Sequence, residues 1–227
     1  MSALCMLPTM RVLAVPVKSL ERAKSRLSPV LSAAERAALS LVMFEDVLEA
    51  CLAQGEWETW VVSRDEAVLE VGARRGARGI SEMGTSLRDA IRQVESELVS
   101  ASSELCVVLA DLPLVTGEAI SQALASDRRP AVVAAPASSD GGTNLLLRRP
   151  PSVISARFGR SSFAKHRWAA RKARVPFGEV RRPGLAFDLD RPEDLARVLA
   201  EGSNRRTRSA CLEMRVPERL RVHAISR

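Results

Sequence analysis

Two short acidic motifs carry the side chains best suited to chemistry on phosphate groups. Asp111 follows the apolar Leu109-Ala110 and precedes Leu112-Pro113, so it lies where a buried strand gives way to a loop. Asp188 and Asp190 follow a second apolar segment. In extended backbone, residues two apart project to the same side, so both carboxylates can face one cation. Because carboxylate oxygens suit Mg²⁺ or Mn²⁺, the motifs predict metal-assisted chemistry on a nucleotide.

Each motif also has a purely structural interpretation. Asp111 could cap the turn before Pro113, since aspartate favours such positions. Asp190 could be the N-cap of a helix that Pro192 opens, and this alternative applies less to Asp188. In open α/β sheets, however, ligands bind at the carboxyl ends of strands, which is where Asp111 is expected.

A cluster of cations follows the first predicted strand. Lys18, Arg22, Lys24 and Arg26 lie close together in a loop that contains no glycine. A phosphate bound there would contact cationic side chains rather than a cradle of glycine amides, so the loop matches neither a Walker motif nor a Rossmann fingerprint. Exposed loop charge is the alternative, and the clustering makes it weaker for Lys18 and Lys24.

Two glycine-containing loops are further candidates for binding. Asp140-Gly141-Gly142-Thr143-Asn144 has the flexibility that lets backbone approach a ligand, although a plain hairpin turn is the competing interpretation. Phe158-Gly159-Arg160-Ser161-Ser162 leads into a helix whose free amides attract anions, although serine capping without a ligand looks the same. His166, inside that helix, is expected to pack. With two histidines and no G-x-S-x-G motif, a Ser-His-Asp hydrolase is disfavoured.

Strand and helix patterns alternate along the chain. The clearest helix start is the capping box Ser32-Ala33-Ala34-Glu35. Strands are expected at 11–17, 57–62, 77–80, 105–109, 131–135, 144–147 and 185–188, with an extended segment through residue 180. Helices are expected at 32–51, 63–74, 86–99, 117–125, 162–172 and 192–200. This alternation predicts an α/β fold with a mostly parallel sheet between two helical layers, in which 144–147 follows a glycine-rich turn that favours an antiparallel strand.

The expected domain spans residues 10–200. A chain of 227 residues is long enough for one sizeable core. From Glu201 onward the periodic pattern gives way to glycine, serine, asparagine and arginine, so residues 201–227, like residues 1–9, are expected to be flexible terminal extensions.

The composition limits the location and chemistry of the protein. No apolar run approaches the roughly 20 residues that span a bilayer, and Met1 to Met10 lack the features of a signal peptide. We therefore expect a cytoplasmic protein without a membrane partner. The four cysteines form no C-x-x-C pair and are expected to be reduced thiols. With two histidines available, a metal must rely chiefly on carboxylates.

The net charge of +7 is unevenly distributed. Residues 148–182 hold 11 Lys and Arg against one Asp or Glu, and residues 201–227 hold seven against three. Such blocks can bind a nucleic-acid backbone, so a basic nucleic-acid-binding protein is one alternative. A small anionic substrate explains the first block equally well.

Five blocks, in the same order, resemble the guanylyltransferases of coenzyme F420 biosynthesis. They are Val15-Pro16-Val17-Lys18 with Ala23-Lys24-Ser25-Arg26-Leu27, Leu109-Ala110-Asp111-Leu112-Pro113-Leu114, Gly141-Gly142-Thr143-Asn144-Leu145-Leu146, Phe158-Gly159 with Ser162-Phe163, and Asp188-Leu189-Asp190. The blocks span about residues 11–200. Members of this family join GTP to a small phosphorylated acid: phosphoenolpyruvate, 2-phospholactate or 3-phosphoglycerate.

The resemblance implies a three-layer, Rossmann-like nucleotidyltransferase fold with a mixed, mostly parallel sheet, similar to that of molybdopterin guanylyltransferases. By motif match it implies that Asp111, Asp188 and Asp190 hold Mg²⁺. The same match makes Asp111 and Lys24 the expected catalytic residues.

The resemblance also implies the binding residues. Those for the GTP phosphates are Lys18, Lys24 and Arg26, and those for the phosphorylated acid are Thr143, Gly159 and Ser162. Family members often have proline where this chain has Arg160, and Gly-Leu-Asn where it has Ser86-Leu87-Arg88.

The expected reaction is attack of the acid's phosphate on the α-phosphorus of GTP, with release of pyrophosphate. Phosphoenolpyruvate is the first expectation for the acceptor, ahead of 2-phospholactate and 3-phosphoglycerate. Because the product anhydride is reactive, we expect a transient hand-off to the next transferase of the pathway, and a homodimer is a further expectation. The enzyme alternative keeps the fold but uses another nucleotide or acceptor.

Overall fold

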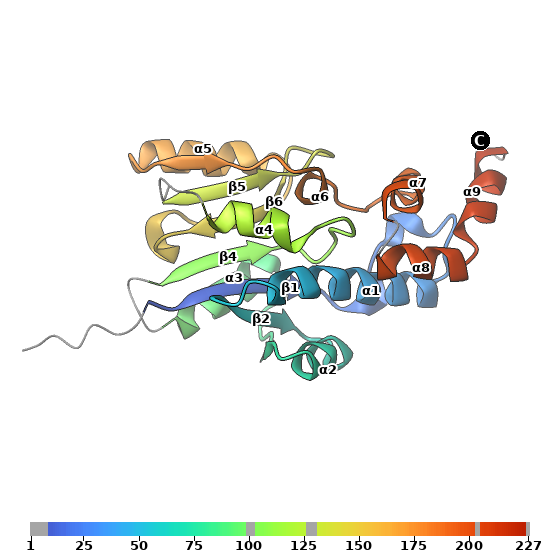
Figure 1. The fold of residues 1–227 in the computed structure, drawn as a ribbon, viewed down its shortest axis with the longest axis horizontal. Helices are drawn as coiled ribbons and strands as arrows, with labels where there is room; N and C mark the ends of the chain where they lie inside the picture. Colours follow the sequence, from blue (N-terminus) through green and yellow to red (C-terminus); the bar gives the residue numbers. More distant parts are fainter. Residues whose placement is uncertain (1–8, 99–102, 126–130, 203–204, 226–227) are drawn as a thin grey trace, which may run out of the picture.

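The described residues form a seven-stranded sheet with helices on both faces (Figure 1). This computed structural model describes residues 9–98, 103–125, 131–202 and 205–225. The strand order is β3-β2-β1-β4-β6-β5-β7. The strands are β1 Arg11–Val17, β2 Glu58–Ser63, β3 Arg78–Ser81, β4 Glu104–Val108, β5 Val132–Pro136, β6 Thr143–Arg148 and β7 Phe177–Glu179. Only the two pairings of β6, with β4 and β5, are antiparallel, so the expected mixed α/β sheet with a reversed strand at 144–147 is confirmed.

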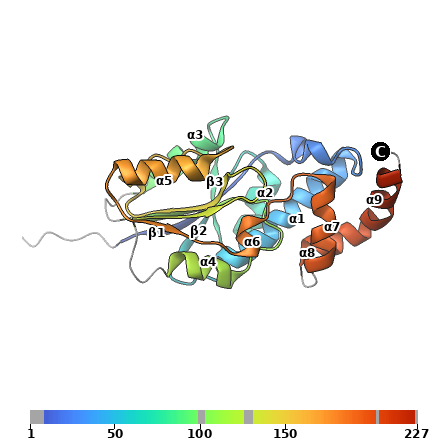
Figure 2. The same cartoon turned by 90° about the horizontal axis from the view of Figure 1, so that it is seen from above.

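Helices cover the sheet in two layers, with α3 and α5 on one face and α1, α2 and α4 on the other (Figure 2). The α-helices are α1 Ala33–Leu52, α2 Glu66–Arg74, α3 Leu87–Glu97, α4 Gly117–Leu124, α5 Ser162–Lys172, α6 Pro183–Ala186, α7 Pro192–Glu201, α8 Arg206–Glu213 and α9 Val216–Ile225. Short 3₁₀ turns are η1 Leu20–Arg22, η2 Ser25–Leu27 and η3 Pro151–Val153.

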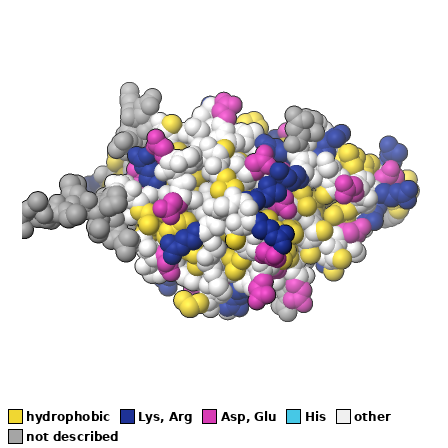
Figure 3. Space-filling model, turned by 60° about the horizontal axis from the view of Figure 1, so that its bottom comes forward, with side chains coloured by type: hydrophobic (Ala, Val, Ile, Leu, Met, Phe, Trp, Pro, Cys, Tyr) yellow, Lys and Arg dark blue, Asp and Glu magenta, His cyan; other side chains and the backbone are white. Residues whose placement is uncertain are grey.

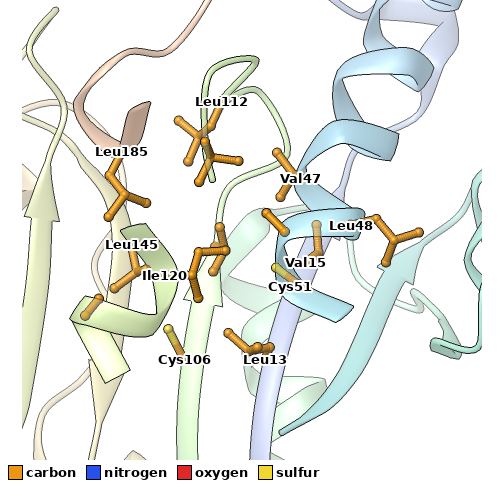
Figure 4. Packing of buried hydrophobic residues seen from close by; sticks show 14 of the residues in the cluster. Leu13, Val15, Val47, Leu48, Cys51, Cys106, Leu112, Ile120, Leu145 and Leu185 are labelled. Carbon is orange, nitrogen blue, oxygen red and sulfur yellow. The ribbon is translucent and has the colours of Figure 1, made fainter. Parts of the chain in front are cut away.

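The central strands are apolar because both of their faces are buried. In β1, Leu13 and Val15 pack against α1 and α4, in the cluster that Figure 4 shows. Val12 and Ala14, on the other face, pack against α3. Successive side chains of a strand point to opposite faces, so a strand covered on both sides has no polar position to spare. This covering explains the uninterrupted apolar run of β1.

The predicted helix starts form as the sequence indicates. At α1, the Ser32 hydroxyl accepts a hydrogen bond from the Glu35 backbone N–H at 3.3 Å, and the Ser32 N–H donates to Glu35 Oε2 at 2.8 Å. At α2, Asp65 Oδ1 accepts from the Ala67 N–H at 3.2 Å, while Asp65 Oδ2 accepts from the Leu20 N–H at 3.1 Å. The second contact ties the loop after β1 to the start of α2.

The predicted strand at 185–188 is wrong. Pro183 opens the short helix α6, which ends at Ala186, since proline suits the first turn of a helix. The edge position beside β5 is occupied by β7 instead, so the extended segment expected through residue 180 is the strand that pairs there.

The flexible extension predicted from residue 201 does not match the described part of the C-terminal segment. Residues 206–225 form α8 and α9, and their Cys211 and Val216 are buried in one cluster with Leu39 of α1 and Val198 of α7. The sequence pattern does not indicate these helices because they are rich in arginine and bury few apolar side chains. Of the predicted N-terminal extension, residues 1–8 lie outside the described residues.

A buried carboxylate attaches α8 to α1. Asp46 is 2% exposed and accepts hydrogen bonds from the Thr207 N–H at 3.0 Å and the Thr207 hydroxyl at 2.6 Å. Its other oxygen accepts from the Arg206 N–H at 3.2 Å. These bonds satisfy amides at the first turn of α8, which have no acceptor inside the helix.

A bidentate ion pair attaches α9 to the start of α1. Arg219 Nη1 donates to Glu35 Oε2 at 2.8 Å, and Arg219 Nη2 donates to Glu35 Oε1 at 2.7 Å. Hydrogen bonds from Arg219 and from Ser32 lower the pKa of Glu35 to about 2. A carboxyl group whose pKa is lowered by folding stabilises the folded state above its unfolded pKa, and loses that contribution as the pH falls through the folded value.

We therefore predict that Glu35→Gln lowers the free energy of unfolding at pH 7, and that the difference from wild type shrinks as the pH falls from about 4.5 toward about 2. Glutamine keeps an oxygen for the Ser32 N–H, so the substitution removes the charge and not the capping box. Urea unfolding of wild type and variant between pH 3 and pH 7 measures this difference in the free energy of unfolding. The control is Glu70→Gln in the exposed Arg74 pair, expected to change little; a difference independent of pH would contradict the assignment.

Candidate active site

A cleft of about 810 Å³ lies at the edge of the sheet where β1 and β4 end. Since these neighbouring strands are parallel, their carboxyl ends meet at one edge. Most of the lining of the cleft comes from the end of β1 and the loop after it (within residues 16–26), from the segment after β3 (within 82–87), from residues 109–111 after β4, and from Asp190. Residues of α1 and α3 and Arg64 complete the lining. The three cations predicted to bind the GTP phosphates, Lys18, Lys24 and Arg26, all line the cleft.

Lys24 joins the two acidic motifs. Its ammonium group donates to Asp111 Oδ2 and to Asp190 Oδ1, each at 2.8 Å. The Lys24 side chain is 10% exposed, whereas those of Asp111 and Asp190 are 31% and 38% exposed. Arg26 adds a longer and more exposed contact to Asp190 Oδ2 at 3.4 Å. The structure thus brings together residues that lie 87 and 166 positions apart in the sequence.

Asp188 completes the charged cluster, the name used below for Lys24, Asp111, Asp188 and Asp190. Phe187 and Leu189 are buried while Asp188 and Asp190 are only partly buried, as the two-residue alternation of extended backbone requires. The Ser139 hydroxyl donates to Asp188 at 2.9 Å. The Leu189 N–H donates to the Asp111 carbonyl oxygen at 3.1 Å, which holds the two acidic loops side by side.

The alternative in which Asp190 is a helix N-cap is not what the structure shows. The N-cap of α7 is Arg191. The carboxylate that accepts from the N–H groups of Asp190 and Arg191 belongs to Asp194, at 2.9 and 2.7 Å. The Asp190 carboxylate is thereby free to face Lys24.

The members of the charged cluster differ in the direction and cause of their pKa shifts. Burial alone would lower the pKa of Lys24, but the charges of Asp111 and Asp190 outweigh burial and raise it. Burial alone would raise the pKa of Asp190, but Lys24 reverses the direction and the pKa is lowered. For Asp188, burial raises the pKa and the charge of Asp111 adds to it, against the Ser139 hydrogen bond. Among the described residues, no cation offsets burial at Asp188 as Lys24 does at Asp190.

The carboxylates are not arranged as a finished metal site. Within the described ranges, no three Asp, Glu, His or Cys side chains form a group that could hold a metal ion. Asp111 Oδ1, however, is buried and has no hydrogen-bond partner in the part of the chain that the structure describes. A buried oxygen of this kind is costly unless something binds it, and it fits a cation placed beside Asp111.

The predicted acid-binding residues come together beside the charged cluster. The Leu109 N–H donates to the Asn144 carbonyl oxygen at 3.0 Å, so the loop carrying Asp111 adjoins the start of β6. There the hydroxyl groups of Thr143 and Ser162 hydrogen bond to each other at 2.9 Å. We call these two residues the hydroxyl pair. The Ser162 N–H donates to the Gly159 carbonyl at 3.0 Å, and Gly159 has a positive φ of 107° that suits glycine.

His166 packs, as the sequence suggested, and it also forms hydrogen bonds. It is 0% exposed, and its ring makes an edge-on contact with Phe158. Both ring nitrogens have polar partners, Thr143 Oγ1 at 3.1 Å and the Arg157 N–H at 2.9 Å.

Sequence reasoning missed two polar residues of the site. Ser139, which hydrogen bonds to Asp188, precedes the glycine-rich turn, and its place in that polar loop was the one available signal. Glu82 lines the cleft just after β3, and burial raises its pKa. Nothing in its sequence neighbourhood marks it as a cleft residue, because it depends on how β3 is placed beside β2.

The first basic block is not one exposed surface. Arg148 is 1% exposed and pairs with Glu95 at 2.7 Å, and Arg149 pairs with Glu104 at 2.6 Å. The face shown in Figure 3, which is turned away from α5, has Lys and Arg side chains interspersed with Asp and Glu side chains. Neither observation favours a nucleic-acid interface.

A family model described as guanylyl transferase CofC like matches residues 10–219, most of the chain and all of the described site. The chain belongs to this guanylyltransferase family. The resemblance seen in the five sequence blocks is therefore confirmed, and the match reaches into α9, past the predicted domain end at residue 200.

Relatives of this guanylyltransferase have been named for three different acceptors. It is 40% identical over 183 residues to phosphoenolpyruvate guanylyltransferase of Sphaerobacter thermophilus, covering 80% of this chain and 88% of that protein. It is 36% identical to 3-phospho-D-glycerate guanylyltransferase of Phenylobacterium zucineum, covering 82% and 88%. It is 34% identical to 2-phospho-L-lactate guanylyltransferase of Methanothermobacter thermautotrophicus, covering 88% and 89%.

Solved structures confirm the nucleotidyltransferase fold of the guanylyltransferase. A Desulfovibrio desulfuricans G20 protein, provisionally assigned as a nucleotide-diphospho-sugar transferase, superposes with a TM-score of 0.75 at 18% identity, covering 95% of this chain and 99% of that one. The fold of 4-diphosphocytidyl-2C-methyl-D-erythritol synthase matches with a TM-score of 0.59 at 14% identity, over 86% and 100%.

Two further features of the guanylyltransferase concern its helices and its cysteines. None of the described helices is long and apolar enough to cross a membrane. Cys51, Cys106 and Cys211 are buried free thiols, and burial raises the pKa of Cys51 to about 12. Such thiols are poor nucleophiles and act as small apolar side chains in the core.

We predict that Lys24→Met lowers the free energy of unfolding by about 2 kcal/mol at pH 7, because Asp111 and Asp190 lose their shared charged donor. Lys24 lowers the pKa of Asp190, and without it this carboxylate binds a proton more readily in the folded state, so the penalty should shrink as the pH falls toward 4. Urea unfolding in EDTA measures it. The control is Arg26→Met, whose exposed contact should count for little; an equal loss in both variants would contradict the role of Lys24.

Proposed function

We propose that this guanylyltransferase transfers GMP from GTP to a phosphorylated three-carbon acid, with release of pyrophosphate, in coenzyme F420 biosynthesis. The observation that carries the proposal is the position of the charged cluster, which lines the cleft through Lys24, Asp111 and Asp190 and adjoins the start of β6, where the hydroxyl pair lies. The cleft offers cations for a triphosphate, and the hydroxyl pair lies at the start of a helix, where an anion is favoured. The acceptors named for the relatives are all phosphorylated acids.

The reaction forms a bond between a phosphate oxygen of the acid and the α-phosphorus of GTP, and breaks the bond from that phosphorus to the bridging oxygen of pyrophosphate. The attacking phosphate is already ionised, so no residue needs to remove a proton. Both reactants are anions. Lys18, Lys24 and Arg26 therefore act by offsetting repulsion and holding the reacting groups in line, which is the main source of catalysis in such transfers.

We further propose that Asp111, Asp188 and Asp190 hold Mg²⁺ when the substrates bind. The unpartnered Asp111 Oδ1 and the uncompensated Asp188 support this assignment. The Lys24 ammonium between Asp111 and Asp190 shows that a cation is stabilised there. The metal would stabilise negative charge on the phosphate oxygens.

Phosphoenolpyruvate is the proposed acceptor among the three acids. It is the acceptor named for the Sphaerobacter relative, which is more similar to this chain than the relatives named for the other two acids. Thr143, Gly159 and Ser162 are the proposed acid-binding residues. Because the phosphoanhydride product is reactive, we propose that it is handed to the next transferase. A homodimeric enzyme is a separate part of this proposal.

The acceptor is identified by supplying GTP, Mg²⁺ and one acid at a time. We predict pyrophosphate release with phosphoenolpyruvate that exceeds release with 2-phospholactate or 3-phosphoglycerate. The assay should be repeated with the downstream transferase present, because a reactive product that accumulates can inhibit its enzyme. Pyrophosphate release that requires a different acid would change the assigned acceptor. If folded protein releases no pyrophosphate with any of the three acids, the proposal is overturned.

We predict that Asp111→Asn, Asp188→Asn and Asp190→Asn each lower kcat by about 100-fold or more, because each removes a carboxylate proposed to hold the Mg²⁺ that stabilises charge on the transferred phosphate. Folding should be nearly unchanged, since the amide has almost the same volume. Mg²⁺ should raise the melting temperature of wild type more than that of the variants. Glu21→Gln, at an exposed position of the same cleft, is the matched control; wild-type activity in all three aspartate variants would contradict the site.

A further inference from the structure

The hydrogen bonds of His166 fix which of its ring nitrogens carries a proton. The Arg157 backbone N–H points at Nε2 at 2.9 Å, and a backbone N–H can only donate. Nε2 must therefore be the acceptor. Burial lowers the pKa of His166 to about 4, and the charges of Arg148, Arg157 and Lys165 act in the same direction, so the ring is neutral at pH 7. A neutral ring that accepts at Nε2 carries its hydrogen on Nδ1.

This tautomer determines the hydrogen bonds of the hydroxyl pair. His166 Nδ1 lies 3.1 Å from Thr143 Oγ1, so the ring donates to Thr143. Ser162 Oγ lies 2.9 Å from the same Thr143 oxygen. The three side chains hold three polar hydrogens but share only two hydrogen bonds. One hydroxyl hydrogen of the pair is therefore left without an acceptor among the residues that the structure describes.

The opposite tautomer would leave nothing to donate. If Nδ1 were the acceptor, Thr143 would donate to the ring and Ser162 would donate to Thr143, which uses both hydroxyl hydrogens of the pair. Both hydroxyls are nearly or fully buried, at 2% and 0% exposure, so water is a poor substitute as a partner. The spare hydrogen thus exists because of the way His166 is held by Arg157.

The two loops that flank the hydroxyl pair carry exposed glycines. Gly159 is exposed, and a Cβ added to it would meet nothing within 4 Å. Gly141 is exposed as well, and its carbonyl oxygen accepts from the Phe163 N–H at 3.2 Å, which joins the two loops around the pair. An acid oxygen bound at these loops would lie beside the first turn of α5, and it would reach the buried spare hydroxyl hydrogen once the two loops move apart.

We propose that His166 is a positioning residue: its Nδ1–H group turns the Thr143–Ser162 pair into a hydrogen-bond donor for an anionic oxygen of the phosphorylated acid. This inference rests on the proposed function for the identity of the ligand. His166 itself does not touch the acid. Its effect should therefore appear in the binding of the acid and not in the binding of GTP.

Two substitutions separate the two hydrogen bonds of the ring. In His166→Asn the side-chain amide can place its N–H group near the position of Nδ1 and still donate to Thr143. In His166→Gln the longer side chain reaches the position of Nε2, so it can accept from Arg157 but leaves Thr143 without its donor. We expect the KM for phosphoenolpyruvate to rise about 10-fold or more in His166→Gln, the size of a lost hydrogen bond to a charged group. His166→Asn should stay within about threefold of wild type, an allowance of under 1 kcal/mol.

The KM for GTP is the internal control, and it should be nearly the same in wild type and both variants. Trp168→Phe, at a 60% exposed position of α5, controls for a general disturbance of the helix and should leave both KM values unchanged. Equal KM values for the acid in His166→Asn and His166→Gln would overturn the proposal. A parallel rise of the KM for phosphoenolpyruvate and the KM for GTP would overturn the proposal too, because such a rise indicates that His166 has a structural role alone.

The tautomer can be measured without any variant that must fold or turn over. A two-bond ¹⁵N–¹H correlation spectrum of the wild-type ring separates protonated from unprotonated nitrogens, and the chain has only two histidines to assign. We expect a protonated Nδ1 at His166, and a protonated Nε2 would overturn the inference. Failure of the proposed function is seen separately, as a wild-type enzyme that turns over none of the three acids.

Discussion

The antiparallel pairing of β6 with β4 is the constraint on which the candidate site depends. In an all-parallel sheet, β6 would begin at the edge opposite to the one where β4 ends. Because β6 runs backwards, Thr143 at its start adjoins Asp111 after β4, and the hydrogen bond from Leu109 to Asn144 closes the contact. The turn before β6 uses Gly141 at a φ of 68°, a conformation that costs glycine little. A glycine that easily adopts the left-handed conformation thus lets Thr143, proposed to bind the acid, lie beside the acidic loop of the cleft.

The two parts of the site are both built on strained backbone. Lys24, in the charged cluster, has a φ of 48°, and Ser161, next to the hydroxyl pair, has a φ of 57°. Non-glycine residues in this region cost about 1–3 kcal/mol each and persist only where their surroundings hold them. At Lys24 the ammonium group is held by two carboxylates, and at Ser161 the N–H donates to the Asp140 carbonyl at 3.3 Å. The conformations that aim these groups are therefore stabilised by the contacts of the site itself.

Sequence reasoning succeeded where a local pattern decides the outcome. The capping box at Ser32, the alternation of strands and helices, and the outward side of Asp188 and Asp190 all follow from periodicity or a few neighbouring residues. It failed where packing decides. The segment 185–188 looks like a strand, but β7 takes the sheet edge. The pairing of Lys24 with Asp190 joins positions 166 residues apart, and no local pattern indicates it. The tautomer of His166 depends on a backbone N–H nine residues away, so composition and spacing predicted only that the ring packs.

The C-terminal helices bear on the site although they contribute no residue to it. Leu27, just after Lys24 and Arg26, is buried in the same apolar cluster as Leu189, which lies between Asp188 and Asp190. Cys211 of α8 and Val216 of α9 are buried in that cluster as well. The cationic loop and the acidic loop of the charged cluster are therefore anchored in one small core, and α8 and α9 cover it. Removing the cover would expose apolar side chains on both loops at once and loosen the 2.8 Å contacts between Lys24 and its carboxylates. The arginine-rich helices α8 and α9 therefore help to hold the cationic and acidic loops of the charged cluster in position.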